Sequence, residues 1–261
     1  VCHAVIYVDG SVAVSGNGTS WNQAYRTLDS AIPFGMGQEI WVAEGTYTPG
    51  STLEPQSNCS IYGGFDGAET DRSQRNITAN PVVIDGQNVR DHVFKIKSSS
   101  LGVRIDGLTI KRGKADGGGW EAYGGGVLVE ARSSTTPTVF ANLTIRDCYA
   151  VTQGGGVMVN CSRAVFESCT FIDNRSNLGG GICGFDADIT IDGCDFQSNY
   201  AVIGSQPRGA AAWIHLNSPS VTNSTFSQNS SDHTGGALEY SFVTDGLVEN
   251  CTFTDNFCGT A

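Results

Sequence analysis

One short motif is repeated along the chain from Val103 onward, and it restricts the possible folds more than any other feature. Its six copies read VRIDGLTI (103–110), VFANLTI (139–145), VFESCTF (165–171), ITIDGCDF (189–196), SVTNSTF (220–226) and LVENCTF (247–253). Glycine-rich copies lie between them: GGGVLV (124–129), GGGVMV (154–159), GGGICG (179–184), GAAAWI (209–214) and GGALEY (235–240). Repetition at intervals of 25 to 35 residues is typical of a solenoid, in which each unit buries its apolar edge against its neighbours.

The alternation of apolar and polar residues divides each repeat into short strands. In VRIDGLTI the alternation breaks at Asp106-Gly107, which predicts two short strands joined by a two-residue bend. The glycine-rich motif supplies a third strand, with Val127 and Val129 facing inward. Its last glycine lies 13 residues before Cys169 in one coil and before Cys194 in the next, so equivalent residues should stack in register. The repeat therefore predicts an all-β fold, a parallel β-helix with three strands per coil.

A third recurrent element, Phe-x-x-Asn, predicts a ladder of stacked phenylalanines with an asparagine near each corner. It occurs at 171–174, 196–199, 226–229 and 253–256. We expect the phenylalanines to stack inside the solenoid. Asparagine near a corner can satisfy turn backbone groups and tolerates the left-handed conformation, so we expect it to shape the corner.

Residues 1–80 lack the regular repeat and are predicted to form an N-terminal cap, followed by β-helix coils over 81–261 with an uncapped C-terminal end. One amphipathic helix is expected there, with an apolar stripe at the 3.6-residue period formed by Trp21, Tyr25, Leu28 and Ile32. Ser20 or Thr19 can cap its start and Pro33 marks its end. Such a capping helix would cover the strand edges and apolar side chains of the first coil.

Composition excludes some classes of function. The net charge of −11 argues against a nucleic-acid partner, because phosphate binding needs clustered Lys and Arg. No apolar run approaches the roughly 18 residues of a membrane span. The chain begins Val-Cys rather than Met, which favours a mature product or an excised fragment.

The nine cysteines and nine glycosylation sequons favour a secreted protein. No CxxC or Cys/His spacing suggests zinc, so disulfides are the expected use of the cysteines. The candidates are Cys2, Cys59, Cys148, Cys161, Cys169, Cys183, Cys194, Cys251 and Cys258. For Cys169 and Cys194, stacking as small buried side chains is an equal alternative. The candidate glycosylation sites are Asn17, Asn58, Asn76, Asn142, Asn160, Asn174, Asn223, Asn229 and Asn250.

The alternating Gly-Gly and Phe-x-x-Asn elements resemble those of the chlamydial polymorphic outer-membrane proteins, whose surface-exposed passenger regions repeat GGAI-like and FxxN motifs. The N-terminal part resembles a wider group of secreted right-handed β-helix proteins, in which IYVDG, SWNQAYRTLDSAI, IWVAEGTY, SIYGGFDGAETDRSQRN and VVIDG occur in this order. The two resemblances imply a right-handed parallel β-helix located outside the cell or at its surface. The chlamydial relatives imply adhesion.

Many right-handed β-helix proteins are polysaccharide lyases or glycoside hydrolases, so an enzyme is the main alternative. Glycosidic hydrolysis needs two carboxylates about 5–10 Å apart. Stacked coils could offer Asp106 above Asp85, or Asp173 near Asp195. However, Asp85 and Asp106 each precede a glycine at a bend, where Asp is favoured by its hydrogen bond to the turn backbone. We therefore expect no catalytic residue.

Other polar groups have equally ordinary interpretations. His92 is expected to be a surface strand residue, and the basic side chains between 95 and 114 a solvated face. Aspartates at coil corners are weak candidates for Ca²⁺ ligands, but the sequence has no EF-hand or RTX nonapeptide. We therefore expect no cofactor.

A carbohydrate-binding module is the third function class considered. Trp120 and Tyr123 lie in the long insert KADGGGWEAYGGG, where exposed aromatic rings could stack on sugars or could equally pack onto the solenoid. The sequence as a whole favours an extracellular structural or adhesive β-helix glycoprotein segment, such as a fibre or surface-layer subunit. Its expected partners are other copies of the protein or the continuation of a longer chain at the C-terminal end, with Cys258 available for crosslinking, and glycans.

Overall fold

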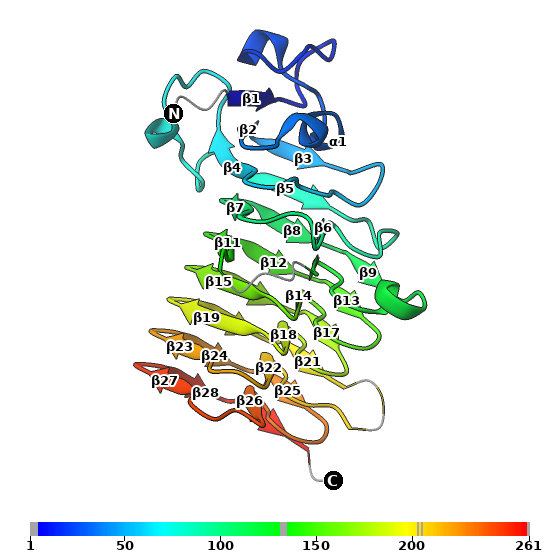
Figure 1. Ribbon diagram of the computed structural model, residues 1–261, viewed down its shortest axis with the longest axis vertical. Helices are drawn as coiled ribbons and strands as arrows, with labels where there is room; N and C mark the ends of the chain where they lie inside the picture. The colour runs from blue at the N-terminus through cyan, green and yellow to red at the C-terminus, as the bar shows by residue number, and fades with distance from the viewer. Residues whose placement is uncertain (1–4, 131–134, 203, 205, 260–261) are drawn as a thin grey trace.

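Four parallel β-sheets run along the molecule, and successive coils of the chain add strands to them in turn (Figure 1). This computed structural model describes residues 5–130, 135–202, 204 and 206–259. Sheet A contains β1 (Val5–Val8), β2 (Glu39–Ala43), β4 (Ser60–Phe65), β7 (Arg104–Asp106), β11 (Thr138–Ala141), β15 (Arg163–Glu167), β19 (Asp188–Asp192), β23 (Ser220–Thr222) and β27 (Leu247–Glu249). Sheet B contains β3 (Gly45–Tyr47), β5 (Val82–Asp85), β8 (Thr109–Lys111), β12 (Thr144–Arg146), β16 (Thr170–Ile172), β20 (Asp195–Gln197), β24 (Thr225–Ser227) and β28 (Thr252–Thr254).

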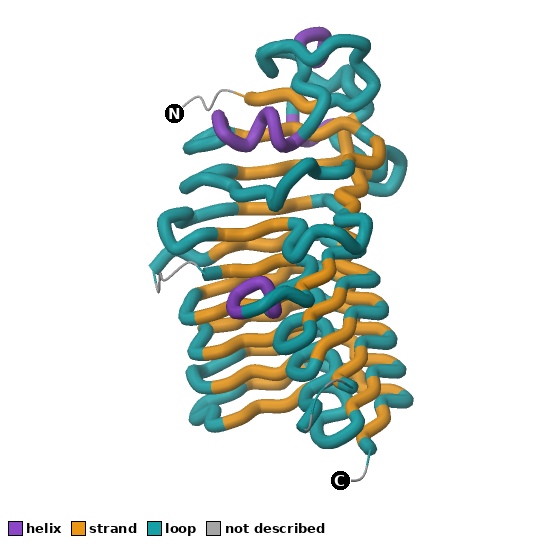
Figure 2. Tube along the Cα trace, turned by 90° about the vertical axis from the view of Figure 1, so that its right-hand side faces the viewer, coloured by secondary structure: helices purple, strands orange, loops and turns teal. Residues whose placement is uncertain are grey.

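The other two sheets are shorter. Sheet C contains β6 (Phe94–Ile96), β10 (Val127–Val129), β14 (Val157–Asn160), β18 (Ile182–Phe185), β22 (Ala212–His215) and β26 (Leu238–Ser241). Sheet D contains β9 (Lys114–Ala115), β13 (Tyr149–Ala150), β17 (Arg175–Ser176), β21 (Tyr200–Ala201), β25 (Ser230–Ser231) and β29 (Phe257–Cys258). The rotated view shows the strands of successive coils lying side by side (Figure 2).

The predicted parallel β-helix is confirmed, but the prediction of three strands per coil is wrong. One coil runs through β14, β15, β16 and β17, which belong to sheets C, A, B and D. The bend at Asp106-Gly107 and the glycine-led third strand are present as predicted. The missed strand is the two-residue strand after each Phe-x-x-Asn element. It is too short to show an alternation, so periodicity could not reveal it.

The interior is a continuous column of apolar side chains with a phenylalanine ladder at its centre. Phe171, Phe196 and Phe226 are fully buried, and their rings stack with centroids 4.6 and 4.8 Å apart. Phe253 extends the ladder at 4.7 Å. In the coil before Phe171 the equivalent position is Ile145. In-register pairing of parallel strands places each ring above the previous one, as the repeat predicts.

A buried asparagine ladder runs beside the phenylalanines and supplies hydrogen bonds at one corner of every coil it crosses. The Oδ1 atom of Asn199 accepts from the backbone N–H of Asn174 at 3.2 Å, and its Nδ2 atom donates to the carbonyl of Phe171 at 2.9 Å. Asn229 and Asn256 repeat both bonds one and two coils further on. The side chains thus satisfy backbone groups that the corner removes from the sheets.

The left-handed conformation at this corner belongs to the residue before the asparagine. Asp173, Ser198, Gln228 and Asp255 have φ between 52° and 56°, and each directly precedes a ladder asparagine. The asparagine itself is fully buried at 174, 199 and 229. The predicted corner role is therefore divided between two neighbouring residues. The first turns the chain, and the asparagine forms hydrogen bonds with the backbone groups of the corner.

The continuous amphipathic helix predicted near the N-terminus is wrong. The segment forms the 3-10 helix η1 (Trp21–Gln23), the α-helix α1 (Leu28–Ala31) and the 3-10 helix η2 (Ile32–Phe34), with α1 capped by the Thr27 hydroxyl. Leu28 and Ile32 pack into the interior, whereas Trp21 packs outside the solenoid. The apolar residues thus serve two different clusters, which a single helical stripe cannot represent. No helix in the described part of the chain is long and apolar enough to span a membrane.

The first coil is nevertheless covered. The loop from Asp9 to Thr27 lies beyond β1 at the blue end of Figure 1, and Tyr25 pairs with Val8 as an isolated β-bridge. Because β1, β2 and β4 join the same sheet as later strands, residues 5–80 contribute coils as well as this cover. At the other end, the last described coil exposes large apolar side chains: Leu247 (46%), Val248 (43%), Phe253 (47%) and Phe257 (61%).

Candidate functional site

A hydrophobic cluster lies against the outer face of sheet A at its N-terminal end. It consists of Trp41, Tyr62 and Phe65, and the rings of Trp41 and Phe65 stack at 4.7 Å. The guanidinium groups of Arg72 and Arg75 lie 4.6 and 5.2 Å from the centroid of the Tyr62 ring, which is favourable because the face of an aromatic ring attracts cations. The aromatic rings are buried under these groups, so they are not open platforms for a ligand.

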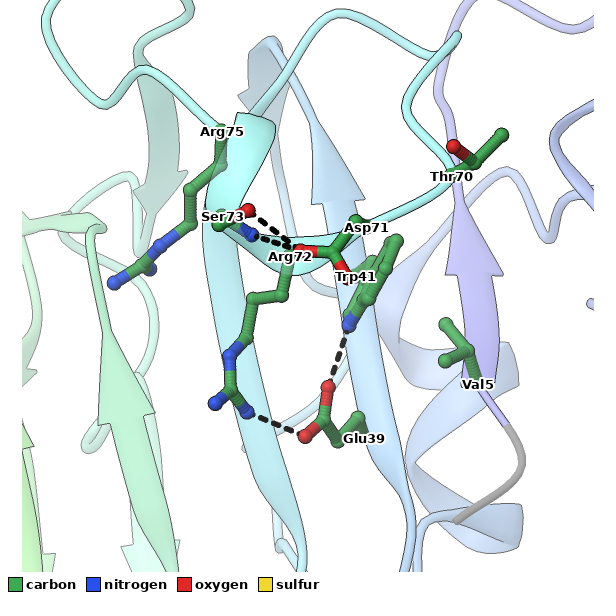
Figure 3. A pocket seen from close by; sticks show the side chains of 8 residues that line it. All are labelled: Val5, Glu39, Trp41, Thr70, Asp71, Arg72, Ser73 and Arg75. Atoms are coloured by element: carbon green, nitrogen blue, oxygen red, sulfur yellow. Dashed lines mark hydrogen bonds and ion pairs between the residues drawn. The ribbon is translucent and has the colours of Figure 1, made fainter. Parts of the chain in front are cut away.

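A shallow depression of about 590 Å³ lies beside this cluster (Figure 3). Its lining residues are Val5, Glu39, Trp41, Thr70, Asp71, Arg72, Ser73 and Arg75. Glu39 accepts from Arg72 at 2.5 Å and from the Trp41 indole at 2.8 Å. Asp71 caps the 3-10 helix η3 (Arg72–Gln74), and the hydrogen bonds from Ser73 lower its pKa. These polar groups therefore engage one another across the depression.

Next to this depression, the carboxylate of Asp106 accepts four hydrogen bonds. It accepts from Arg75 at 2.8 Å, from Arg104 at 2.8 and 3.1 Å, and from Asn142 at 2.9 Å. Burial alone would raise the pKa of Asp106, but these donors outweigh burial and lower it. A carboxylate held ionised by four donors is poorly suited to act as a general acid or base, and its role here is to tie the 66–80 segment to sheet A.

Asp85 has the same kind of role on sheet B. It pairs with Lys111 at 3.3 Å and with Arg112, whose Nε atom donates at 2.8 Å. Burial would raise the pKa of Asp85, and the bonds from Arg112, the Gln87 backbone and Lys111 lower it instead. Asp85 stacks on Lys111, whereas Asp106 stacks on Tyr62 in another sheet, so the predicted carboxylate pair does not form.

The other polar residues singled out in the sequence lie in three separate environments. Asp173 lies beside Asp147, and its pKa is raised by burial and by that negative charge. Asp195 accepts from the Thr225 hydroxyl at 2.5 Å. His92 is buried rather than on the surface, with Nδ1 3.1 Å from the carbonyl of Gly124. Among the described residues, no group of three or more His, Cys, Asp or Glu side chains could hold a metal ion.

Trp120 and Tyr123 do lie together, on and just after the 3-10 helix η4 (Gly119–Ala122). Their ring centroids are 5.4 Å apart. Trp120 is 45% exposed, whereas Tyr123 packs against an outer cluster formed by Leu128, Met158, Cys183 and Trp213 on sheet C. One ring is thus available to solvent and the other holds the insert against the solenoid.

The eight described cysteines are free thiols, so the intramolecular disulfides expected among them are not formed; Cys2 lies outside the described residues. Cys169 and Cys194 stack inside the coils, where the Cys169 backbone N–H lies 3.4 Å from the Cys194 sulfur. Of the two interpretations given for this pair, the structure shows the second, in which the two side chains are buried and stacked. The other positions are Cys59, Cys148 and Cys183, which are buried, Cys161 and Cys251, which are partly buried, and Cys258, which is exposed.

We expect thiol reagents to separate these cysteines sharply. Burial raises the pKa of Cys59 and of Cys148 to about 12, and thiolate is the reactive form. Native protein treated with a disulfide reagent and mapped by peptide mass should therefore label exposed Cys258 within minutes, while Cys59 and Cys148 react only after unfolding. Cys169 and Cys194 should behave in the same way, because their side chains are buried between the coils. The variant Cys258→Ser should lose the fast phase. Rapid native labelling of Cys169 would contradict the buried stack.

The sequons fall into two groups. Asn174 and Asn229 belong to the buried ladder and have no exposed side chain, so the prediction that they carry glycans is wrong for this fold. The exposed or partly exposed sites are Asn17, Asn58, Asn76, Asn142, Asn160, Asn223 and Asn250. Of these, Asn142, Asn223 and Asn250 lie at the bend between sheets A and B with φ between 50° and 53°.

Comparison with known proteins identifies the family. A family model described as the right handed beta helix region matches residues 125–261, just over half of the chain. The chain belongs to this family. The solved structures similar to this right-handed β-helix protein include the pectin methylesterase PemA from Erwinia chrysanthemi, at 13% identity and a TM-score of 0.49 over 86% of this chain and 66% of that chain. Another is the pectin methylesterase from Aspergillus niger in deglycosylated form, at 14% identity and a TM-score of 0.47 over 97% and 86%.

The chain thus spans just under two thirds of the length of PemA. A comparison with curated protein sequences found no match.

Sequence reasoning missed two surface features of this β-helix protein. The first is the Arg75–Asp106 ion pair, whose partners are 31 residues apart and belong to different coils. The second is an aromatic strip along the outer face of sheet C, formed by Phe185, His215 and, directly after β26, Phe242. The Phe185 and His215 rings stack at 5.1 Å, and Phe242 meets His215 edge-on at 5.2 Å. Its sequence signal is the aromatic or His residue that directly follows two of the five glycine-rich copies: Phe185 after 179–184 and His215 after 209–214.

Proposed function

We propose that this β-helix protein is a stiff structural or adhesive segment of an extracellular glycoprotein. The observation that supports it best is the pair of unbroken ladders, Phe171 to Phe253 and Asn174 to Asn256, which join consecutive coils inside one column. Such a column resists bending, because bending would separate stacked rings and break buried hydrogen bonds. The resemblance of its Gly-Gly and Phe-x-x-Asn elements to chlamydial passenger repeats supports the adhesive form of the proposal.

The ends of such a segment are its expected contact points. The last described coil presents exposed apolar side chains on strands that pair on one side only, and an exposed Cys258 lies close by. We propose that another copy of the protein, or further chain, covers this coil and that Cys258 can crosslink there. An apolar, unpaired strand edge is a natural template for such pairing.

Sedimentation and electron microscopy test this proposal directly. Rising protein concentration should produce end-to-end particles, and mild oxidation should convert them to covalent dimers that Cys258→Ser prevents. Replacing Phe257, which is 61% exposed and lies outside the phenylalanine ladder, by Ser should weaken assembly without changing the β-sheet spectrum. A protein that stays monomeric at every concentration would contradict the assembly proposal. Turnover of a polysaccharide panel that is abolished by substituting a carboxylate would favour the enzymatic alternative.

A further inference from the structure

The aromatic strip on sheet C ends beside a sequon, and this neighbourhood suggests what covers it. Asn160, the last residue of β14, is in register with Phe185 of β18, and Phe185 is in register with His215 of β22. In-register residues of parallel strands point to the same side of the sheet, so the three side chains form one outward ladder.

The orientation of the rings gives this ladder a free face. The planes of Phe185 and His215 are within 14° of parallel, on strands of adjacent coils. One face of Phe185 is therefore covered by His215, and its other face is turned toward the coil that carries Asn160. Phe185 remains 37% exposed, and Asn160 contributes no ring to cover it.

The Asn160 amide also differs from the other sequon amides of the repeat. The Nδ2 atoms of Asn142 and Asn223 donate to the carboxylates of Asp106 and Asp192 at 2.9 and 2.7 Å. Asn250 donates to Asn223, and the amides of Asn174 and Asn229 are buried in the ladder. Within the described residues, the Nδ2 atom of Asn160 donates no hydrogen bond, so it is free to carry a substituent.

Resting on the proposed extracellular function, we propose that Asn160 carries an N-linked glycan whose first sugar ring packs on the free face of Phe185 and continues the aromatic ladder by one coil. In the modification, the Asn160 amide nitrogen attacks the anomeric carbon of a polyprenyl-pyrophosphate-linked oligosaccharide. The N–C bond forms, the bond to the pyrophosphate oxygen breaks, polyprenyl pyrophosphate leaves, and the amide loses one proton.

Several observations favour a sugar as the occupant. The apolar C–H face of a pyranose ring suits the electron-rich face of an aromatic ring, and its hydroxyl groups stay in water. The spacing of neighbouring strands, about 4.8 Å, is close to the 4.6 to 5.1 Å that separates the centroids of rings stacked on successive coils of this protein. On the opposite side of Asn160 the neighbouring coil carries the Lys95–Glu130 ion pair at 3.3 Å, so the apolar face is found only on the Phe185 side.

The test is expression of the chain through a glycosylating secretory pathway, followed by site mapping with glycosidase in heavy-oxygen water. We expect Asn160 to be occupied. Trimming the glycan to one sugar should preserve its stabilising effect, and complete removal or Asn160→Gln should lower Tm by roughly 2–4 °C. In a Phe185→Ala background this difference should vanish, and in a Phe242→Ala background it should remain; Phe185→Leu replaces the alanine variant if that fails to fold.

The outcomes are distinct. An unoccupied Asn160 in a protein glycosylated at Asn17, Asn58 or Asn76 would overturn this inference alone, as would a Tm difference unchanged by Phe185→Ala. A secreted protein without glycan at any sequon would count against the proposed glycoprotein as well. If unglycosylated protein instead binds free chito-oligosaccharides with a change in Trp213 fluorescence lost in Phe185→Ala, the strip receives an external glycan and the assignment to Asn160 is wrong.

Discussion

Replacing Asn199 by Ala should destabilise the protein more than any exposed substitution in the same coil. Asn199 is fully buried, and its side chain serves the N–H of Asn174 and the carbonyl of Phe171. Alanine leaves both groups buried without a partner, and each orphaned group costs about 1–3 kcal/mol, so we expect a loss of roughly 2–6 kcal/mol. Denaturant unfolding followed by circular dichroism measures this loss.

The matched control is Gln197→Ala, which removes an exposed amide two residues earlier on the same coil. We expect it to change the free energy of unfolding by less than about 0.5 kcal/mol. Amide hydrogen exchange should locate the effect of Asn199→Ala at Asn174 and its neighbouring coils, because the contacts of a solenoid unit are with adjacent units. Equal stability of Asn199→Ala and Gln197→Ala would show that the ladder does not stabilise the fold.

Asp106→Asn should produce the second large effect, and its size should depend on pH. At neutral pH the variant removes the buried carboxylate that Arg75 and Arg104 share, and Arg104 is left with the longer ion pair to Glu167, at 3.6 Å. Removing one partner of a buried ion pair costs about 3–5 kcal/mol. Because hydrogen bonds hold the pKa of Asp106 below its usual range, folding favours the ionised form. The ion-pair contribution is therefore fully present above the unfolded pKa of about 3.9 and is lost as the pH falls through the lower folded pKa.

The measurement is the free energy of unfolding of the wild-type protein and the variant between neutral pH and about pH 2.5. The gap between them should be constant down to roughly pH 4 and should shrink below it. Asp188→Asn serves as the control. Asp188 lies on the same sheet, but it is exposed and its ion pair with Arg163 is long, at 4.0 Å. An exposed pair contributes about 0–1 kcal/mol, so this gap should be small at every pH. A gap for Asp106→Asn that widens toward low pH would contradict the assigned pKa direction.

The sequence predicted the solenoid well, because its information is local and repeated. Each copy of the repeat states independently that positions such as Ile105, Phe140 and Phe166 face inward, and these residues are fully buried in one sheet. Constant spacing between copies then fixes the stacking. A prediction supported by several copies remains valid when the sequence of one coil departs from the repeat.

Features that depend on contacts between distant segments were beyond the same reasoning. Trp21, Tyr25, Leu28 and Ile32 fit a helical period, but whether an apolar side chain faces the interior or the outer cluster is decided by segments elsewhere in the chain. Likewise, Asp106 could be recognised as a bend residue, whereas its partner Arg75 could not be identified from the repeat. Burial of the sequon residues Asn174 and Asn229 follows from the Phe-x-x-Asn register, and the sequon motif alone does not contain it.

The strand order has a consequence for how the length of such a protein can change. In the repeat, each strand pairs only with the strands of the preceding and following coils, from β7 to β27 in sheet A. The segment that joins sheets D and C has 11 residues between β9 and β10 but six between β13 and β14, and β10 still pairs with β14 in register. Gain or loss of a whole coil would therefore leave every other coil with the same kind of neighbour. The length of the solenoid can thus change in steps of one coil, while the surfaces at its two ends stay the same.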